Sequence, residues 1–175
     1  MAFLVVAYPK IQQNDFDWIQ SYRKSNDERQ FSIVQPHFTL VFAVDDLPED
    51  EFVSEVEERL EGVSSFEFVT KVATINKDDS GDYYHEFLVP DAGYSDIVKL
   101  HDKLYSGMFS PYLRLDIDFI PHIGIGSSNE ALISKDRIDQ LNTVGVSISG
   151  EVSSIDVIKY TGGPVVTVRK FDLVN

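Results

Sequence analysis

Two short stretches decide the fold, QPHFTLVFAV at residues 35–44 and IPHIGIG at residues 120–126. Each places a prolyl-histidyl pair before a run of apolar residues, which is typical of a β-strand. Side chains two apart on a strand point to the same face, so each histidine shares a face with every second residue after it. In the first strand the opposite face, formed by Phe38, Leu40 and Phe42, is apolar and belongs in the core. The sequence therefore predicts two strands that each present one histidine on the face turned away from the core.

The same order of elements surrounds both stretches. A short apolar strand comes first, at residues 2–8 and again at residues 83–89, and an amphipathic helix follows each of these strands. After each histidine strand comes a second helix. A long strand with alternating side chains then follows, at residues 66–76 in the first case and at residues 146–160 in the second. A glycine-containing turn leads from there into a final strand.

This repeated order predicts an α+β fold. We interpret the chain as a single domain spanning residues 1–175, bilobal and duplicated, with pseudo-repeat halves of about 1–80 and 81–175. Two antiparallel or mixed sheets are expected to line a central cleft, with the helices on the outside.

Composition limits the classes of function. Of the 175 residues, 43% are hydrophobic, which is enough for the core of one domain. No cysteine is present, so thiolate metal sites, thiol nucleophiles and disulfides are excluded, and a reducing cytoplasm is the expected location. No apolar run approaches the roughly 20 residues that span a bilayer, so we expect no membrane partner. The formal net charge of −14 argues against binding of duplex DNA or long RNA. We expect a monomer.

The two histidines carry the candidate chemistry. His37 shares its strand face with the hydroxyl of Thr39, and His122 shares its face with Gly124. Histidine titrates near neutral pH, so two imidazoles brought to one cleft can act as a general base and a general acid. A neighbouring hydroxyl can donate a hydrogen bond to a phosphoryl oxygen and orient it. His37 and His122 are therefore the candidate catalytic residues, and Thr39 is a candidate substrate-binding residue.

The segments HFTL at residues 37–40 and HIGI at residues 122–125 resemble the paired histidine-apolar-Thr/Ser-apolar motifs of the two-histidine phosphoesterase superfamily. This superfamily includes bacterial 2′-5′ RNA ligase-like proteins and cyclic nucleotide phosphodiesterases. The resemblance implies a bilobal fold with both motifs lining a central groove, and roles for His37, Thr39 and His122. It also implies metal-independent chemistry on a 2′,3′-cyclic phosphate or a 2′-5′ phosphodiester of a small nucleotide or RNA end. No phosphate-binding loop, dinucleotide fingerprint or metal-ligand motif occurs in the sequence, so we expect neither a cofactor nor a metal.

Gly124 departs from the superfamily motif, which carries threonine or serine at that position. Glycine supplies no hydroxyl, so one phosphate contact implied by the resemblance is missing. Two interpretations stay open: the glycine weakens or abolishes catalysis, or it lets a ligand approach the backbone at Gly124 and Gly126 more closely. The leading hypothesis is a phosphodiesterase. The alternative is a catalytically degenerate protein that binds a nucleotide or another phosphorylated ligand.

The other histidines and the arginines near the motifs have simpler explanations. His85 and His101 lack the motif context and are expected at the surface or in structural roles. Arg23, Lys24 and Arg29 precede the first histidine strand, and Arg114 precedes the second. All four are expected to be solvated charges unless they reach the cleft and recruit a phosphate. The negative net charge predicts that the pH optimum of any activity is displaced upward from the free-histidine value.

Overall fold

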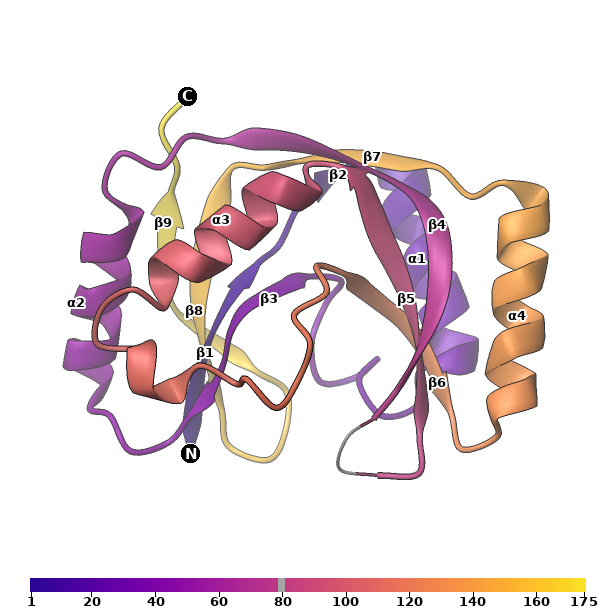
Figure 1. Ribbon diagram of the computed structural model, residues 1–175, viewed down its shortest axis with the longest axis horizontal. Helices are drawn as coiled ribbons and strands as arrows, with labels where there is room; N and C mark the ends of the chain where they lie inside the picture. The colour runs from indigo at the N-terminus through magenta and orange to yellow at the C-terminus, as the bar shows by residue number, and fades with distance from the viewer. Residues whose placement is uncertain (79–80) are drawn as a thin grey trace.

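The computed structural model describes residues 1–78 and 81–175 and confirms the predicted α+β fold, with two antiparallel sheets and helices outside them (Figure 1). In these residues the helices are α1 (Gln13–Asn26), α2 (Glu49–Leu60), α3 (Tyr94–Leu104) and α4 (Ala131–Val144), with a short 3-10 helix η1 (Ser110–Tyr112). The strands are β1 (Ala2–Ala7), β2 (Lys10–Ile11), β3 (Phe38–Val44), β4 (Phe66–Lys77), β5 (Tyr84–Ala92), β6 (Ile123–Ser128), β7 (Ile148–Val152), β8 (Ser154–Tyr160) and β9 (Val166–Asp172).

The two sheets each combine strands from distant parts of the chain. Within the described residues, one sheet has the strand order β3-β1-β8-β9 and the other has the order β2-β7-β4-β5-β6. All pairings between these strands are antiparallel. The first strand, β1, pairs with β8 from the far end of the chain, and β4 pairs with both β5 and β7. Each sheet is therefore built from strands of both the first and the second half of the chain.

The order strand, helix, histidine strand, helix, strand occurs twice, as β1-α1-β3-α2-β4 and as β5-α3-β6-α4-β7, with the short β2 inserted in the first series. The interpretation of the chain as one domain with pseudo-repeat halves stays a prediction, and the boundary near residue 80 lies outside the described residues. The strands β3 and β6 nevertheless occupy equivalent positions. Each lies at one edge of its sheet, beside β1 in one case and beside β5 in the other.

The prediction of one long strand over residues 146–160 is wrong. These residues form β7 and β8, with a break at Ser153. Before the break the chain pairs with β4 in one sheet, and after it the chain pairs with β1 and β9 in the other. The apolar alternation changes phase at the break, from Ile148 and Val152 in β7 to Ile155 and Val157 in β8, and a single regular strand cannot place both sets on one face.

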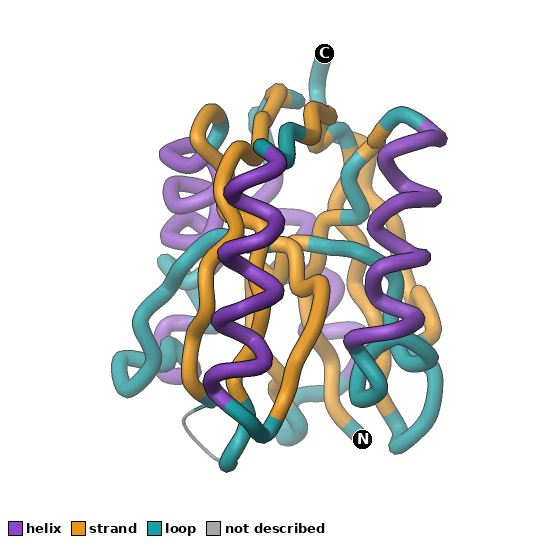
Figure 2. Tube along the Cα trace, turned by 90° about the vertical axis from the view of Figure 1, so that its right-hand side faces the viewer, coloured by secondary structure: helices purple, strands orange, loops and turns teal. Residues whose placement is uncertain are grey.

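The helices pack along the outside of the sheets, as Figure 2 shows from the side. Helix α1 lies against β6 and α4 against β4, whereas α2 lies against β1 and α3 against β3. The core continues between the sheets, because the rings of Phe38 on β3 and Phe68 on β4 meet edge to face with centroids 5.1 Å apart. Among the described helices, none has the length and apolar character needed to cross a bilayer.

Candidate active site

His37 and His122 occupy equivalent positions on the two lobes. His37 is the residue before β3 and His122 is the residue before β6, one residue ahead of the strands on which the sequence placed them. The Nδ1 atom of His37 lies 2.7 Å from the carbonyl oxygen of Gln35, and that of His122 lies 2.6 Å from the carbonyl oxygen of Ile120. A proline separates the two partners in each case and restricts the backbone of the residue before it, which is the residue that supplies the carbonyl. The same backbone contact therefore holds both rings.

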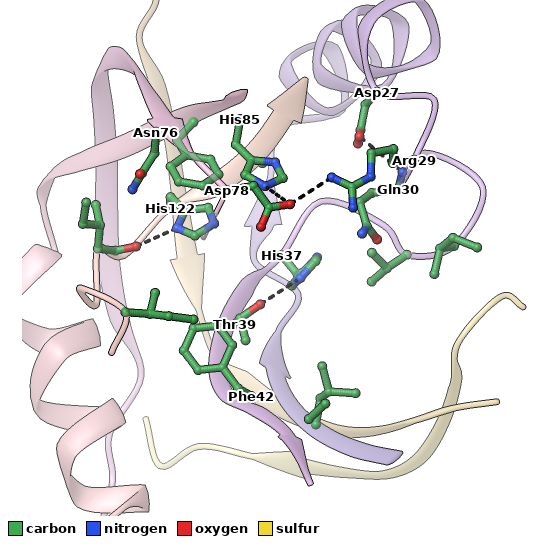
Figure 3. Close-up of a pocket in the computed structure, with 18 of the residues that line it drawn as sticks. Asp27, Arg29, Gln30, His37, Thr39, Phe42, Asn76, Asp78, His85 and His122 are labelled. Atoms are coloured by element: carbon green, nitrogen blue, oxygen red, sulfur yellow. Dashed lines mark hydrogen bonds and ion pairs between the residues drawn. The ribbon is translucent and has the colours of Figure 1, made fainter. Parts of the chain in front are cut away.

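This contact sets the tautomer of each imidazole. A carbonyl oxygen only accepts hydrogen bonds, so Nδ1 donates the proton and a neutral ring keeps a lone pair on Nε2. Both rings and Thr39 line one cleft of about 660 Å³ between the two sheets (Figure 3). Gly124 lines the same cleft. The structure thus brings together all four residues that the sequence analysis singled out.

The two lobes differ in what surrounds the histidine rings. The Oγ1 atom of Thr39 lies 3.1 Å from Nε2 of His37, so this hydroxyl can donate to the unprotonated nitrogen. Gly124 stands at the matching position on β6 and supplies no hydroxyl. The ring of His122 is instead stacked on Phe87 of β5, with centroids 3.5 Å apart and planes 18° from parallel. Phe87 was not singled out from the sequence, yet it fixes the plane of His122.

Burial lowers the pKa of both imidazoles. Desolvation is the largest cause and brings the pKa of His37 and the pKa of His122 to about 4. The backbone hydrogen bond of each ring acts in the opposite direction and raises its pKa. Positive charge lowers both values further, from Arg23 at His37 and from His37 and His85 at His122. Both rings are therefore neutral at pH 7 in the free protein. This direction is opposite to the one that the negative net charge favours, because loss of solvent outweighs the screened field of charges spread over the surface.

The two cleft glycines of β6 have different surroundings. Neither has a positive φ, so backbone conformation does not explain Gly124. A Cβ atom on Gly124 would meet nothing within 4 Å, which leaves open space in the cleft at this position. A Cβ atom on Gly126 would lie 2.5 Å from Oε2 of Glu86. Packing therefore requires glycine at position 126 but not at position 124.

Glu86 explains why Gly126 is required. This side chain is completely buried and accepts hydrogen bonds from the Tyr22 hydroxyl of α1 at 2.9 Å, the Ser134 hydroxyl of α4 at 2.9 Å and Nη1 of Arg137 at 3.0 Å. A buried carboxylate is stable only with such partners. The cluster ties α1 and α4 to β5, the strand that carries the ring stacked on the second histidine.

Gly126→Ala is expected to lower the free energy of unfolding by about 1–3 kcal/mol, because the new methyl group displaces the Glu86 carboxylate from its donors. Gly124→Ala is the matched control, since it makes the same change two residues away on the same strand and meets open space. Urea unfolding of the three proteins measures both effects. Equal stability of the two variants would contradict this account of the glycines.

Arg23 is buried, so the prediction that it is a solvated charge is wrong. Its Nε atom lies 3.0 Å from a carboxylate oxygen of Asp27, and its Nη2 atom lies 2.9 Å from the carbonyl oxygen of Val34. Val34 directly precedes Gln35, whose carbonyl holds the ring of His37. Arg23 therefore fixes the backbone that positions the first histidine.

The remaining two histidines have different roles. His85 lines the cleft, and its Nε2 atom lies 3.4 Å from a carboxylate oxygen of Asp78, which also accepts a hydrogen bond from Arg29 at 3.1 Å (Figure 3). His85 therefore belongs to the wall of the site, which its sequence context did not indicate. His101 is buried on α3 with its ring stacked on Phe119 at 3.6 Å, and this position fits a structural role.

The chemistry that this cleft offers is proton transfer and hydrogen bonding. Between residues 1 and 78 and between 81 and 175, no group of three or more His, Cys, Asp or Glu side chains is arranged to hold a metal ion. The groups that line the cleft are two imidazoles, the hydroxyl of Thr39, which lies 3.1 Å from Nε2 of His37, and the open backbone at Gly124.

Comparisons with known proteins agree with this geometry. The family model of the 2′-5′ RNA ligase superfamily matches residues 9–164. No curated protein is similar enough in sequence to count as a match. TT0787 of Thermus thermophilus aligns with a TM-score of 0.62 and 13% identity over 99% of this chain and 98% of that one. Apo LigT of Escherichia coli aligns with a TM-score of 0.57 and 14% identity over 99% and 98%. Usb1 of Kluyveromyces marxianus aligns with a TM-score of 0.55 and 8% identity over 95% and 97%.

Two antiparallel sheets that flank one cleft, with a histidine from each lobe, define the class of fold as that of the two-histidine phosphoesterases. The family match includes both histidine motifs and most of the chain. The chain belongs to the 2′-5′ RNA ligase superfamily. The solved structures, at 8–14% identity, support the fold alone.

Proposed function

We propose that the protein is a metal-independent phosphodiesterase that opens a 2′,3′-cyclic phosphate, or cleaves a 2′-5′ phosphodiester, of a small nucleotide or an RNA end. The observation that carries the proposal is the matched pair of Nδ1 hydrogen bonds, which leaves Nε2 as the unprotonated nitrogen of both neutral rings in one cleft. One Nε2 takes a proton from water as the water oxygen attacks phosphorus. The other Nε2 gives a proton to the ribose oxygen as its bond to phosphorus breaks. Hydrolysis thus adds one water and leaves the protons balanced.

The general acid in this scheme acquires its proton with the substrate. Both imidazoles are neutral in the free protein, because burial holds the pKa of each at about 4. A phosphate anion beside an imidazole stabilises the charged ring and raises its pKa. Substrate binding is therefore coupled to the uptake of about one proton.

This coupling gives the pH dependence a definite sign. A histidine whose pKa is lowered to about 4 holds a proton in the free protein only at acid pH, so the fraction with one charged ring falls as the pH rises. We expect kcat/KM for a cyclic nucleotide to peak below pH 6.5, the ordinary histidine value, and to fall toward neutral and alkaline pH. Initial rates between about pH 4 and about pH 9, in the presence of EDTA, measure this profile. A rate that climbs steadily to the alkaline end would contradict acid catalysis by histidine.

Gly124→Thr tests the missing hydroxyl. The Cβ atom meets open space and the backbone has an ordinary φ, so threonine is expected to fit. We expect turnover of a cyclic nucleotide to rise by roughly tenfold. This gain is smaller than the contribution of a natural hydrogen-bond donor to a phosphoryl oxygen, because the surrounding site did not evolve around the new hydroxyl. Gly124→Val has the same branched shape without the hydroxyl and should give no gain. A loss of turnover in both variants would instead assign Gly124 to close approach of the ligand.

A second candidate function is nucleotide binding without catalysis. It is favoured by the absent hydroxyl at Gly124 and by the neutral state of both histidines in the free protein. Structures of two proteins of this fold include small nucleotides: LigT of Escherichia coli with 3′-AMP and with ATP, and Usb1 of Kluyveromyces marxianus with uridine monophosphate.

A turnover assay with uridine 2′,3′-cyclic phosphate in EDTA, beside calorimetric titration with uridine 3′-monophosphate, tests the proposed function. Conversion of the cyclic phosphate to the monophosphate supports the phosphodiesterase. Binding of the monophosphate without any turnover of the cyclic compound would contradict it and would favour the binding protein.

A further inference from the structure

A helix holds the segment that precedes each active-site histidine. In the first half, Arg23 on α1 donates to the carbonyl oxygen of Val34 at 2.9 Å, and Val34 lies three residues before the first histidine. In the second half, Phe119 lies three residues before the second histidine. Its ring stacks on His101 of α3, with centroids 3.6 Å apart and planes 19° from parallel. Helices α1 and α3 occupy matching places in the two series of elements, so His101 is the counterpart of Arg23 in position.

The segment that carries Phe119 depends on side chains for its position. Residues 113–122 are all described and belong to no helix or strand, so neither a helical turn nor a strand pairing fixes their backbone. Ile120, the residue after Phe119, supplies the carbonyl oxygen that accepts the hydrogen bond from Nδ1 of His122 at 2.6 Å. A shift of Phe119 therefore moves the group that sets the tautomer of His122.

His101 is itself held in place from the other side. It is buried, and its ring centroid lies 4.8 Å from that of Tyr105, one turn further along α3. The Tyr105 hydroxyl accepts a hydrogen bond of 3.0 Å from the backbone N–H of Phe42 on β3. Phe42 and Phe119 both line the cleft. A continuous chain of contacts thus joins β3, the strand that follows the first histidine, to the carbonyl that holds the second.

The His101 ring acts here as a flat, uncharged surface. Burial lowers its pKa below the ordinary histidine value, so the ring is neutral at neutral pH. Its Nδ1 atom lies 3.0 Å from a carboxylate oxygen of Asp102, which is exposed to solvent. A phenyl ring can therefore replace the imidazole in the stack and loses only this contact at the surface.

We propose that His101 is a positioning residue of the active site, which holds Phe119 and, through it, the Ile120 carbonyl that fixes the ring of His122. His101 is not among the residues that line the described part of the cleft, so it acts through its neighbours and touches no reacting atom. Its effect on turnover rests on the proposed function. Its effect on the His122 ring needs no substrate and can be measured in the free protein.

Nitrogen-15 NMR of the histidine side chains, at neutral pH and without ligand, measures the effect on the ring. In the wild-type protein the protonated Nδ1 and the unprotonated Nε2 of His122 should give two well-separated resonances. In His101→Ala the hold on the Ile120 carbonyl is lost, both tautomers become populated, and these two resonances are expected to move toward each other. The resonances of His37, which Gln35 holds, should stay where they are.

Three further variants separate positioning from simple loss of stability. His101→Phe keeps a flat ring against Phe119 and is expected to keep the wild-type His122 resonances. Leu100→Ala is the matched control, because Leu100 is on the same helix and both residues are 4% exposed. It should lower the stability and leave the His122 resonances unchanged. Phe119→Ala removes the other ring of the stack from a half-buried position, and it carries the test if His101→Ala does not fold.

Turnover of uridine 2′,3′-cyclic phosphate shows what the position of the ring contributes to the chemistry. We expect His101→Ala to lower kcat by roughly tenfold, because a misplaced proton-transfer group slows the chemical step. KM should change by less than about twofold, since the residue contacts no ligand. In His101→Phe, kcat should stay within about twofold of the wild-type value.

The outcomes distinguish this inference from the proposed function. Unchanged His122 resonances in both His101→Ala and Phe119→Ala would overturn the inference and leave the phosphodiesterase intact. The same would follow if Leu100→Ala moved these resonances as far as His101→Ala does, or if His101→Phe did not preserve them. Moved resonances in a protein whose wild type turns over no cyclic nucleotide would support the role of His101 in holding the ring and would overturn the proposed function alone.

Discussion

His37→Gln and His122→Gln are each expected to lower kcat for uridine 2′,3′-cyclic phosphate by roughly 10²–10⁴-fold, the usual contribution of a positioned acid or base. Glutamine keeps a polar group near the position of the ring nitrogen but transfers no proton. The double variant is expected to lose little more than either single variant, because the acid and the base act in the same step. Single-turnover and steady-state rates of the four proteins, measured at the acid optimum, test this.

Thr39→Val is expected to lower kcat less than the histidine variants do. It keeps the branched shape and the strand preference while removing the hydroxyl that lies 3.1 Å from Nε2 of His37. We expect roughly tenfold lower kcat with little change in stability. Urea unfolding separates loss of chemistry from loss of fold in every variant. Full activity in the double histidine variant would eliminate the phosphodiesterase. If the rate loss of the double variant equals the product of the losses of the two single variants, the histidines do not act as a unit.

Arg23→Met is expected to lower the free energy of unfolding by about 3–5 kcal/mol, the usual effect of breaking a buried ion pair from one side. The side chains of Arg23 and Asp27 are only 2% and 6% exposed, so the variant leaves a buried carboxylate without its counter-charge. It also releases the carbonyl oxygen of Val34, next to the residue that holds His37. Urea and thermal unfolding measure the loss.

The paired variant Arg23→Met/Asp27→Asn is the control for this interpretation. With both charges removed, no uncompensated ion stays buried, and the asparagine oxygen can still accept the backbone N–H of Gln30, which lies 3.3 Å from the Asp27 carboxylate. We expect the double variant to recover at least half of the lost stability. A loss below about 1 kcal/mol in Arg23→Met would contradict the description of Arg23 as a buried, positioning residue.

The histidine pair could be predicted because its signal is local and occurs twice. Each motif combines a proline, a histidine and an alternating apolar strand, which places the histidine on the face away from the core. The order of elements around both motifs was enough to predict an α+β fold with two sheets. The same signal placed Thr39 beside His37 and Gly124 beside His122, and all four residues line the cleft.

The parts that the sequence did not reveal depend on contacts between distant segments. Phe87 meets His122 because β5 pairs with β6, and no local pattern states that pairing. Arg23 looks like any exposed helical arginine until α1 packs against the sheet. The break at Ser153 is marked only by a change of phase in the apolar alternation, which does not state that the chain moves to the other sheet there. The lowered pKa of each histidine cannot be predicted from the sequence, because composition gives the net charge, whereas desolvation depends on the folded cleft.

The central claim is that Nε2 of His37 and Nε2 of His122 contact one phosphoryl group. Nitrogen-15 NMR of the histidine side chains, during titration with uridine 3′-monophosphate, tests it most directly. We predict that the Nε2 resonances of His37 and His122 move together, with one dissociation constant and in the direction of protonation, while the buried His101 stays unchanged. Movement of only one of the two histidines, or nucleotide binding that moves neither, would contradict the claim.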